Sequence, residues 1–156
     1  LNPKHEALLP ALDGRRPVVF AAHRADDLRT ALRISDEFKL KPVIALGTEG
    51  FLLLDELAKR KVPVIVHPAT QRPGGSMDTV NTLLGLAAAL KERGVPVTVG
   101  TGFEGYVPKQ HSLRHEAALF AANGLGPAAL RAITLDAAEL LGVAKDRGSL
   151  EAGKVA

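Results

Sequence analysis

Short apolar runs recur four times along the chain, and each of them opens with a Pro-Val pair. The runs read PVVFAA, PVIAL, PVIVH and PVTVG. Runs that are rich in valine and isoleucine, without polar alternation, are typical of parallel strands covered on both faces. Proline is tolerated at the first residue of a strand because the ladder does not yet need its N–H. We therefore predict strands over residues 17–22, 42–46, 63–67 and 96–100.

A stretch with helical periodicity follows each predicted strand. Residues 24–38 place Leu28, Ala31, Leu32 and Phe38 near one face and charged residues opposite them. The other predicted helices are a short one from Pro3, one at residues 51–60, one from Asp78 to Gly94, one from Ser112 to Ala122, and two short ones that begin near Pro127 and Thr134.

The helix between the third and fourth strands is predicted from a capping residue and an apolar face. Asp78 is the expected N-cap, and Gly94 is the expected end of the helix. The residues expected on its buried face are Val80, Leu83, Leu84, Ala87 and Leu90.

Strand and helix alternate four times, which predicts an α/β fold of parallel βα units. Four consecutive units are the layout of half of a TIM-type (βα)8 barrel, whose chemistry lies at the carboxyl ends of the strands. A sheet of only four strands has two open edges that invite pairing with another chain. We therefore expect a complementing half-barrel as the partner, in a homo- or hetero-oligomer.

Composition narrows the class of protein without identifying it. The chain has 156 residues, 46% of them hydrophobic, which is enough for one domain with a core. The absence of cysteine excludes disulfides and thiolate chemistry. No apolar run approaches the roughly 20 residues that span a bilayer, so we expect a cytoplasmic protein without a membrane partner.

The net charge of +3 is weak support for a nucleic-acid partner. Acidic residues are interspersed with the basic ones, and aromatic residues make up only 4% of the chain. An ordinary solvated surface explains this pattern better, so we expect no nucleic acid as a partner.

The chain begins at Leu1, has Met77 as its only methionine and ends at Ala156. We expect it to be a piece of a longer protein.

Two segments near the end of the chain carry a specific resemblance. ITLDAAELLGV at residues 133–143, followed by GSLEAGK at residues 148–154, resembles the closing segment of the amidohydrolase superfamily. AHRADD at residues 22–27 and GTEG at residues 47–50 resemble the fifth and sixth strand ends of imidazolonepropionase-related members. The resemblance implies that residues 1–147 are strands five to eight of the barrel. Residues 148–156 would then begin the return into a truncated β-sandwich domain.

The resemblance also implies a chemistry. Members of this family hydrolyse C–N bonds, often in small cyclic amides, with one or two divalent metals such as zinc. The metal lowers the pKa of bound water and polarises the carbonyl group. The family takes histidines from strands five and six and an aspartate from strand eight, and the corresponding residues here are Ala21, Leu46 and Gly102. None of these side chains can bind a metal, so we expect no bound cofactor and a degenerate metal site.

Other residues could line a pocket or rebuild a site at the strand ends. The best candidates for chemistry are His23, His67 and Glu104. Alternatively, these residues and Glu49 only end strands, cap helices or anchor loops. The side chains expected to line a pocket for a small-molecule ligand are Ala21, Leu46, Thr48, Gly102 and Tyr106.

His111 and His115 have the i, i+4 spacing that places two side chains on one helical face. They could join a metal or acid–base cluster, but an exposed helix start explains them as well. The sequence has no G-x-S-x-G motif, so a serine nucleophile on a nucleophile elbow has no support.

Three functions remain open from the sequence. The first is a C–N hydrolase frame for small cyclic amides with a reduced or lost metal site. The second is a non-catalytic partner subunit or small-ligand-binding module that keeps the same frame. The third is an active enzyme that uses a rebuilt cluster containing His23 or His67.

Overall fold

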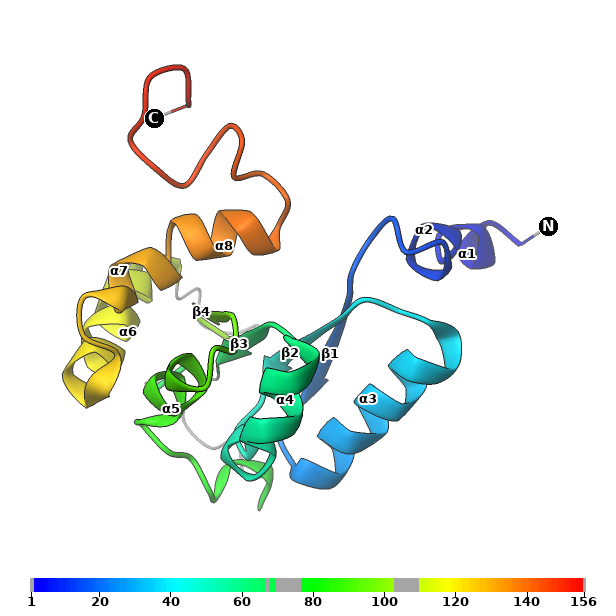
Figure 1. The fold of residues 1–156 in the computed structure, drawn as a ribbon, viewed down its shortest axis with the longest axis horizontal. Helices are drawn as coiled ribbons and strands as arrows, with labels where there is room; N and C mark the ends of the chain where they lie inside the picture. Colours follow the sequence, from blue (N-terminus) through cyan, green and yellow to red (C-terminus); the bar gives the residue numbers. More distant parts are fainter. Residues whose placement is uncertain (1, 67, 70–76, 103–109, 156) are drawn as a thin grey trace.

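The structure is a computed structural model that describes residues 2–66, 68–69, 77–102 and 110–155 (Figure 1). A single parallel sheet contains the described strands in the order β1-β2-β3-β4. Their bounds are β1 (Val18–Ala22), β2 (Pro42–Leu46), β3 (Val64–Val66) and β4 (Val97–Val99). All three neighbouring pairs are parallel, and the four predicted strands are confirmed to within a residue or two at each described end. The last residue of the predicted third strand, His67, lies outside the described residues.

Helices connect the strands as predicted for βα units. The α-helices are α1 (Pro3–Glu6), α2 (Leu9–Leu12), α3 (Ala25–Phe38), α4 (Leu54–Arg60), α5 (Leu86–Glu92), α6 (Leu113–Phe120), α7 (Ala128–Ala132) and α8 (Leu135–Leu140). Shorter helical turns are η1 (Gly50–Leu53), η2 (Met77–Thr79), η3 (Gln110–Ser112) and the π-turn η4 (Ala121–Leu125). None of the described helices is long and apolar enough to cross a membrane.

The core lies between the sheet and the helices that connect its strands. Helices α3, α4 and α5 follow one another along the sheet, and α6 and α7 lie beyond α5 (Figure 1). Ile44 in β2 and Leu28, Leu57 and Leu90 in the three helices are fully buried. Burial of each such side chain stabilises the fold by roughly 1.5–3 kcal/mol relative to exposure. This core fixes the strand ends from which a site can be built.

The first strand has a face that the described chain does not cover. Val19 is 54% exposed and Ala21 is also exposed, whereas Val43 and Ala45, their partners in β2, are buried. The same edge strand therefore presents an apolar side chain to solvent.

The predicted helix from Asp78 to Gly94 is wrong in its first half. Helix α5 begins only at Leu86, and Asp78 lies in the turn η2. Thr82 donates both its N–H and its hydroxyl to the carbonyl of Thr79, at 3.1 and 2.6 Å. This local side-chain bond competes with helix formation. The apolar residues predicted for the buried face before Leu86 are instead exposed, namely Val80, Leu83 and Leu84.

Smaller differences have local causes. The short helix predicted from Pro3 is divided into two single turns, α1 and α2. Phe38, predicted on the buried face of α3, is 52% exposed because α3 ends at this residue. Thr134 precedes α8, but its hydroxyl donates back to the carbonyl of Leu130 instead of capping the helix.

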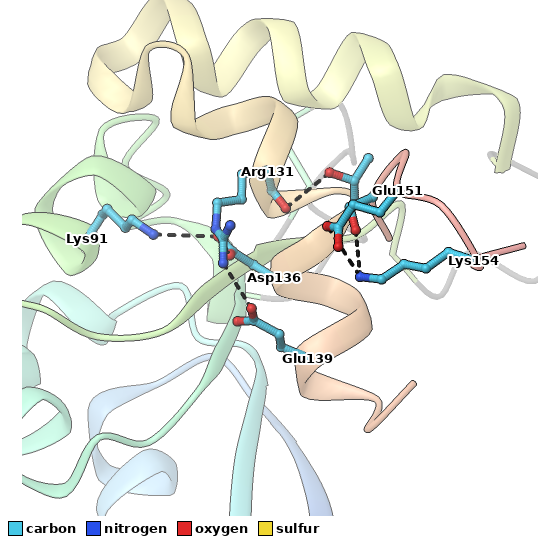
Figure 2. A network of polar contacts seen from close by, with 8 residues as sticks. Lys91, Arg131, Asp136, Glu139, Glu151 and Lys154 are labelled. Carbon is cyan, nitrogen blue, oxygen red and sulfur yellow. Dashed lines mark hydrogen bonds and ion pairs between the residues drawn. The ribbon is translucent and has the colours of Figure 1, made fainter. Parts of the chain in front are cut away.

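Gly148 packs closely against α8, and polar contacts join the residues that follow it. A Cβ at Gly148, which has φ +95°, would come within 2.6 Å of the Cβ of Ala138. The Lys154 ammonium donates to the Ser149 hydroxyl at 2.7 Å and lies 3.4 Å from the Glu151 carboxylate (Figure 2). Residues 148–155 form no strand here, and the predicted return into a sandwich domain stays a prediction.

A second polar network joins α8 to its neighbours. The carboxylate of Asp136 lies 2.5 Å from Arg131 Nε and 3.5 Å from Lys91 Nζ, and Arg131 also contacts Glu139 at 2.9 Å (Figure 2). Because the Asp136 side chain is only 13% exposed, its two contacts are less screened than ordinary surface pairs. They fix α8 against α5 and α7.

Candidate functional site

The loops that follow β1 and β2 are tied together by their backbones. The N–H of Gly47 donates to the carbonyl of Ala22, and the N–H of Glu49 donates to the carbonyl of His23, both at 2.8 Å. The carboxyl ends of parallel strands meet at one edge of the sheet. These two bonds therefore extend the sheet contact into the loops that carry the candidate side chains.

Glu49 is the carboxylate that anchors this edge. It is 9% exposed, and its Oε2 accepts the backbone N–H of Ala25 at 2.7 Å. Its Oε1 accepts the side-chain amide of Asn81 at 2.7 Å. The N-cap residue of α3, Arg24, makes no side-chain capping bond, so Glu49 supplies the cap from the next loop. The Ala25 hydrogen bond, followed by that from Asn81, lowers the pKa of Glu49.

His23 lies beside this anchor and is bonded to a buried hydroxyl. Its Nδ1 lies 2.7 Å from Oγ1 of Thr48, and Thr48 is 1% exposed. Partial burial lowers the pKa of His23, and the charge of Asp78 opposes that effect. The imidazole therefore favours its neutral form at neutral pH, which is the form that can accept a proton.

A small pocket opens at the carboxyl ends of β2, β3 and β4, which we call the strand-end pocket. Its volume is about 160 Å³, and its lining consists of Leu46, Ile65, Val66, Pro68 and residues 100–102. None of these residues carries a charged side chain. The lining that the described residues provide is therefore mostly apolar, with the Thr101 hydroxyl and backbone groups as its polar features.

The structure places the predicted site residues in different surroundings. Leu46 and Gly102 line the strand-end pocket. Thr48 is buried and contacts His23 instead of lining that pocket. Ala21 is exposed on β1 and does not line it either. The other three predicted residues, His67, Glu104 and Tyr106, lie outside the described residues.

The described residues do not fit the metal that the family resemblance implies. Among them, no three histidine, aspartate or glutamate side chains are placed to hold an ion. Ala21, Leu46 and Gly102, which the resemblance assigns to the family's ligand positions, offer no donor side chain. His111 and His115 are both exposed, in η3 and α6, as an exposed helix start predicts.

One buried carboxyl group was missed from the sequence. Glu116 in α6 is 0% exposed, and its Oε2 accepts the backbone N–H of Ala69 at 2.7 Å. Ala69 follows Pro68, which lines the strand-end pocket. The sequence feature that could have indicated its burial is the i, i+4 spacing of Glu116 and Phe120. Residues so spaced share a helical face, and Phe120 is buried.

Two of the larger pockets lie at the opposite end of the strands from the candidate site. Their volumes are about 660 and 420 Å³, and they share Pro63, Glu139 and Leu140. The prolines that precede or open the four strands line one or both of them, which places both at the amino ends. In barrels that end serves stability, and the opposite end carries the chemistry.

Comparison with solved structures places this arrangement among known folds. An amidohydrolase from Thermotoga maritima MSB8 superposes with a TM-score of 0.91 and 30% sequence identity. It matches 99% of this chain, but the chain spans only 40% of that protein. An adenosine deaminase from Xanthomonas campestris, solved with bound zinc, superposes with a TM-score of 0.67 at 23% identity. It matches 96% of this chain and 38% of its own.

These comparisons confirm the predicted fold class, parallel βα units that form half of a TIM-type barrel. The fold resembles part of an amidohydrolase and part of an adenosine deaminase. No family model and no curated protein matches the chain.

Proposed function

We propose that this chain is the C-terminal half of an imidazolonepropionase-like amidohydrolase barrel that binds a small cyclic amide and has lost the standard metal site. The observation that carries the proposal is the lining of the strand-end pocket. Leu46 and Gly102 line it at two of the positions where the resemblance expects metal ligands, and neither can bind an ion. The frame is that of a C–N hydrolase, and metal-dependent hydrolysis is reduced or absent.

The remaining side chains support binding and positioning. Glu49 holds the start of α3, and Glu116 holds Ala69, which follows the lining residue Pro68. In the metal-loaded relatives that the resemblance implies, the ion would supply the polarised carbonyl and the activated water. Among the described residues, no cluster of side chains is placed to hold such an ion. The protein therefore serves as a ligand-binding module or a non-catalytic partner subunit, in the cytoplasm.

Metal content tests this function directly. We expect the full-length protein, purified without chelators from zinc-supplemented cells, to contain far less than one zinc per chain by elemental analysis. We also expect no zinc-stimulated hydrolysis of imidazolones, hydantoins or lactams. A zinc amidohydrolase carried through the same purification is the control. Stoichiometric zinc in our protein, or hydrolysis that a chelator abolishes, would refute the lost site.

One observation favours a second function, hydrolysis by a rebuilt site. Burial holds the pKa of His23 below its usual value, which suits a general base at neutral pH. If this reading is right, His23→Ala abolishes turnover of a cyclic amide while the thermal unfolding midpoint stays close to that of the wild type. Unchanged turnover in His23→Ala would contradict hydrolysis by a site that contains His23.

We further propose that a complementing half-barrel covers the open face of β1. Val19 is 54% exposed on this edge strand, and apolar edge strands promote pairing with other chains. The solved amidohydrolase is more than twice as long as the part that this chain matches, so such a protein has enough additional chain to supply the cover.

We expect the chain produced alone to self-associate, and Val19→Glu to shift it towards monomer in size-exclusion chromatography with light scattering. Val80→Glu is the control, because Val80 is 63% exposed but lies outside the sheet. It should leave the assembly unchanged. A monodisperse wild-type monomer that resists proteolysis would contradict the partner proposal.

A further inference from the structure

Basic residues come just before each of the four strands. They read RR at residues 15–16, KLK at 39–41, RK at 60–61 and KER at 91–93. The segments that precede parallel strands meet at one edge of the sheet, so the fold brings these four groups to the amino ends of the strands. A group of like charges on one side of a protein produces a potential that attracts ions of the opposite sign.

Part of this positive charge is already paired with carboxylates. Arg60 donates to both oxygens of Asp36 at 2.8 Å, and the other members with carboxylate partners are Arg15, Lys91 and Arg93. Among the described residues, the members that make no ion pair are Arg16, Lys39, Lys41 and Lys61. The charge of these four side chains is therefore available to a ligand.

Two of the four unpaired cations line the pocket of about 660 Å³ at the amino ends of β1, β2 and β3, which we call the amino-end pocket. The charged residues in its lining are Asp36, Lys41, Arg60, Lys61 and Glu139. The carboxylates of Asp36 and Glu139 are neutralised by Arg60 and Arg131, at 2.8 and 2.9 Å. The two lysines leave the lining with an excess of positive charge.

The uncharged residues that the described chain contributes to this pocket are apolar apart from Ser35. They include Leu40, Val43, Val62 and Leu140, together with the prolines at the strand starts. The Ser35 hydroxyl already donates to the carbonyl of Ala31 at 2.7 Å. The volume lies within the range of small-molecule sites, and apolar surroundings strengthen an ionic contact relative to bulk water.

Helix ends alone do not explain both lysines. Lys61 ends α4 with φ 51°, and Lys39 ends α3 with φ 53°, where a cation complements the helix dipole. Lys41 belongs to no helix, and a Cβ at Gly14 would lie 3.7 Å from its Cε. Lys41 and Lys61 therefore reach the same pocket from two different loops. Lys39 does not line it and offers a matched position outside the pocket.

We propose that the amino-end pocket binds an amphipathic organic anion. Lys41 and Lys61 pair with its anionic group, and its apolar body packs against Leu40 and Leu140. An inorganic anion would leave the apolar lining in contact with water, and a neutral molecule would leave the two ammonium groups without a counter-charge. The pocket lies at the opposite end of the strands from the strand-end pocket, so the inference goes beyond the proposed function and does not depend on it.

Calorimetric titration of the full-length protein tests the inference, with octanoate as the probe. We expect saturable binding of one octanoate per chain, and each methylene added from hexanoate to decanoate should tighten binding about two- to fourfold. 1-Octanol and octylammonium share the alkyl chain but lack the negative charge, so they should bind about tenfold more weakly or less. Absence of saturable octanoate binding, or equal binding of 1-octanol, overturns the inference.

A double variant and a matched control locate the anionic group. Lys41→Gln with Lys61→Gln should weaken octanoate by about tenfold or more and 1-octanol by less than about twofold. Lys39→Gln is the control, because Lys39 is also an unpaired lysine at a left-handed helix end. It should bind octanoate as the wild type does. Unchanged octanoate binding in the double variant, or an equal loss in Lys39→Gln, contradicts the proposed contacts.

NMR locates the apolar body independently. Octanoate should shift the methyl signals of Leu40 and Leu140 in a saturable way and leave those of Ile65, which lines the strand-end pocket, unchanged. Shifts confined to Ile65 would place the anion at the carboxyl ends of the strands and overturn the inference. Zinc content and cyclic-amide hydrolysis, which test the proposed function, are measured separately and do not change this outcome.

Discussion

Replacing Glu116 by alanine is expected to lower the free energy of unfolding by about 3 kcal/mol. The substitution removes a fully buried carboxyl group and leaves the Ala69 N–H without the acceptor that it has at 2.7 Å. An unsatisfied buried donor costs roughly 1–3 kcal/mol, and the space left by the side chain adds a cavity term. Urea unfolding followed by circular dichroism measures the change.

Two further variants separate the hydrogen bond from the loss of bulk. Glu116→Gln keeps an oxygen that can accept the Ala69 N–H, so it should recover more than half of the lost stability. Glu92→Ala, on the exposed end of α5, should change the free energy of unfolding by less than about 0.5 kcal/mol. If Glu116→Ala costs no more than Glu92→Ala, the carboxyl group does not stabilise the fold through Ala69.

The loss of this hydrogen bond should also be measurable at the backbone amide of Ala69. In Glu116→Ala, we expect the amide hydrogen of Ala69 to exchange with solvent about tenfold faster or more, because its local opening costs less free energy. The amides of residues 43–46 in β2 serve as an internal reference. A uniform increase across β2 and Ala69 would indicate global destabilisation instead of a local contact.

The order of strands and helices could be predicted from the sequence because the patterns that indicate it are local. A proline at the start of a strand and a valine-rich run after it need no distant residue to be interpreted. All four strands therefore occur where these pairs predict them. The helix from Asp78 failed for a local reason as well, since the Thr82 hydroxyl takes the carbonyl of Thr79. The periodicity of apolar residues does not reveal this competing hydrogen bond.

The site was harder to predict because its contacts join residues far apart in sequence. Glu49 caps a helix that begins 24 residues earlier, and Glu116 reaches back 47 residues to Ala69. Residue type alone indicates neither partner. The pairing of His23 with Thr48 follows from the parallel register of β1 and β2, in which Ala22 lies opposite Leu46. Two strand ends in register place the residues after them side by side.

Replacing Glu49 by alanine is expected to cost about 2 kcal/mol at neutral pH. The carboxylate accepts the first N–H of α3 and also holds the Asn81 side chain, both at 2.7 Å. Loss of a helix cap costs roughly 0.5–2 kcal/mol, and a negative charge near a helix N-terminus adds a smaller stabilisation. Glu37→Ala, which removes an exposed carboxylate from the same helix, should cost less than about 0.5 kcal/mol.

The stabilisation by Glu49 should depend on pH with a definite sign. Hydrogen bonds from Ala25 and then Asn81 lower the pKa of Glu49 in the folded chain. Because that pKa lies below the unfolded value, the stabilisation is complete above the unfolded pKa and is lost as the pH falls through the folded one. Glu49→Gln keeps an acceptor oxygen but cannot ionise, so its stability lacks this dependence.

The measurement is the difference in unfolding free energy between the wild type and Glu49→Gln, at about pH 7 and about pH 4. His23 is present in both proteins, so its own titration cancels in the difference. We expect the wild type to be the more stable protein at the higher pH, and its advantage to shrink at the lower one. An advantage that stays constant or grows on acidification would mean that the ionised carboxylate does not cap α3. The link between the loops after β1 and β2 would then rest on the backbone bonds of Gly47 and Glu49 and on the contact between His23 and Thr48.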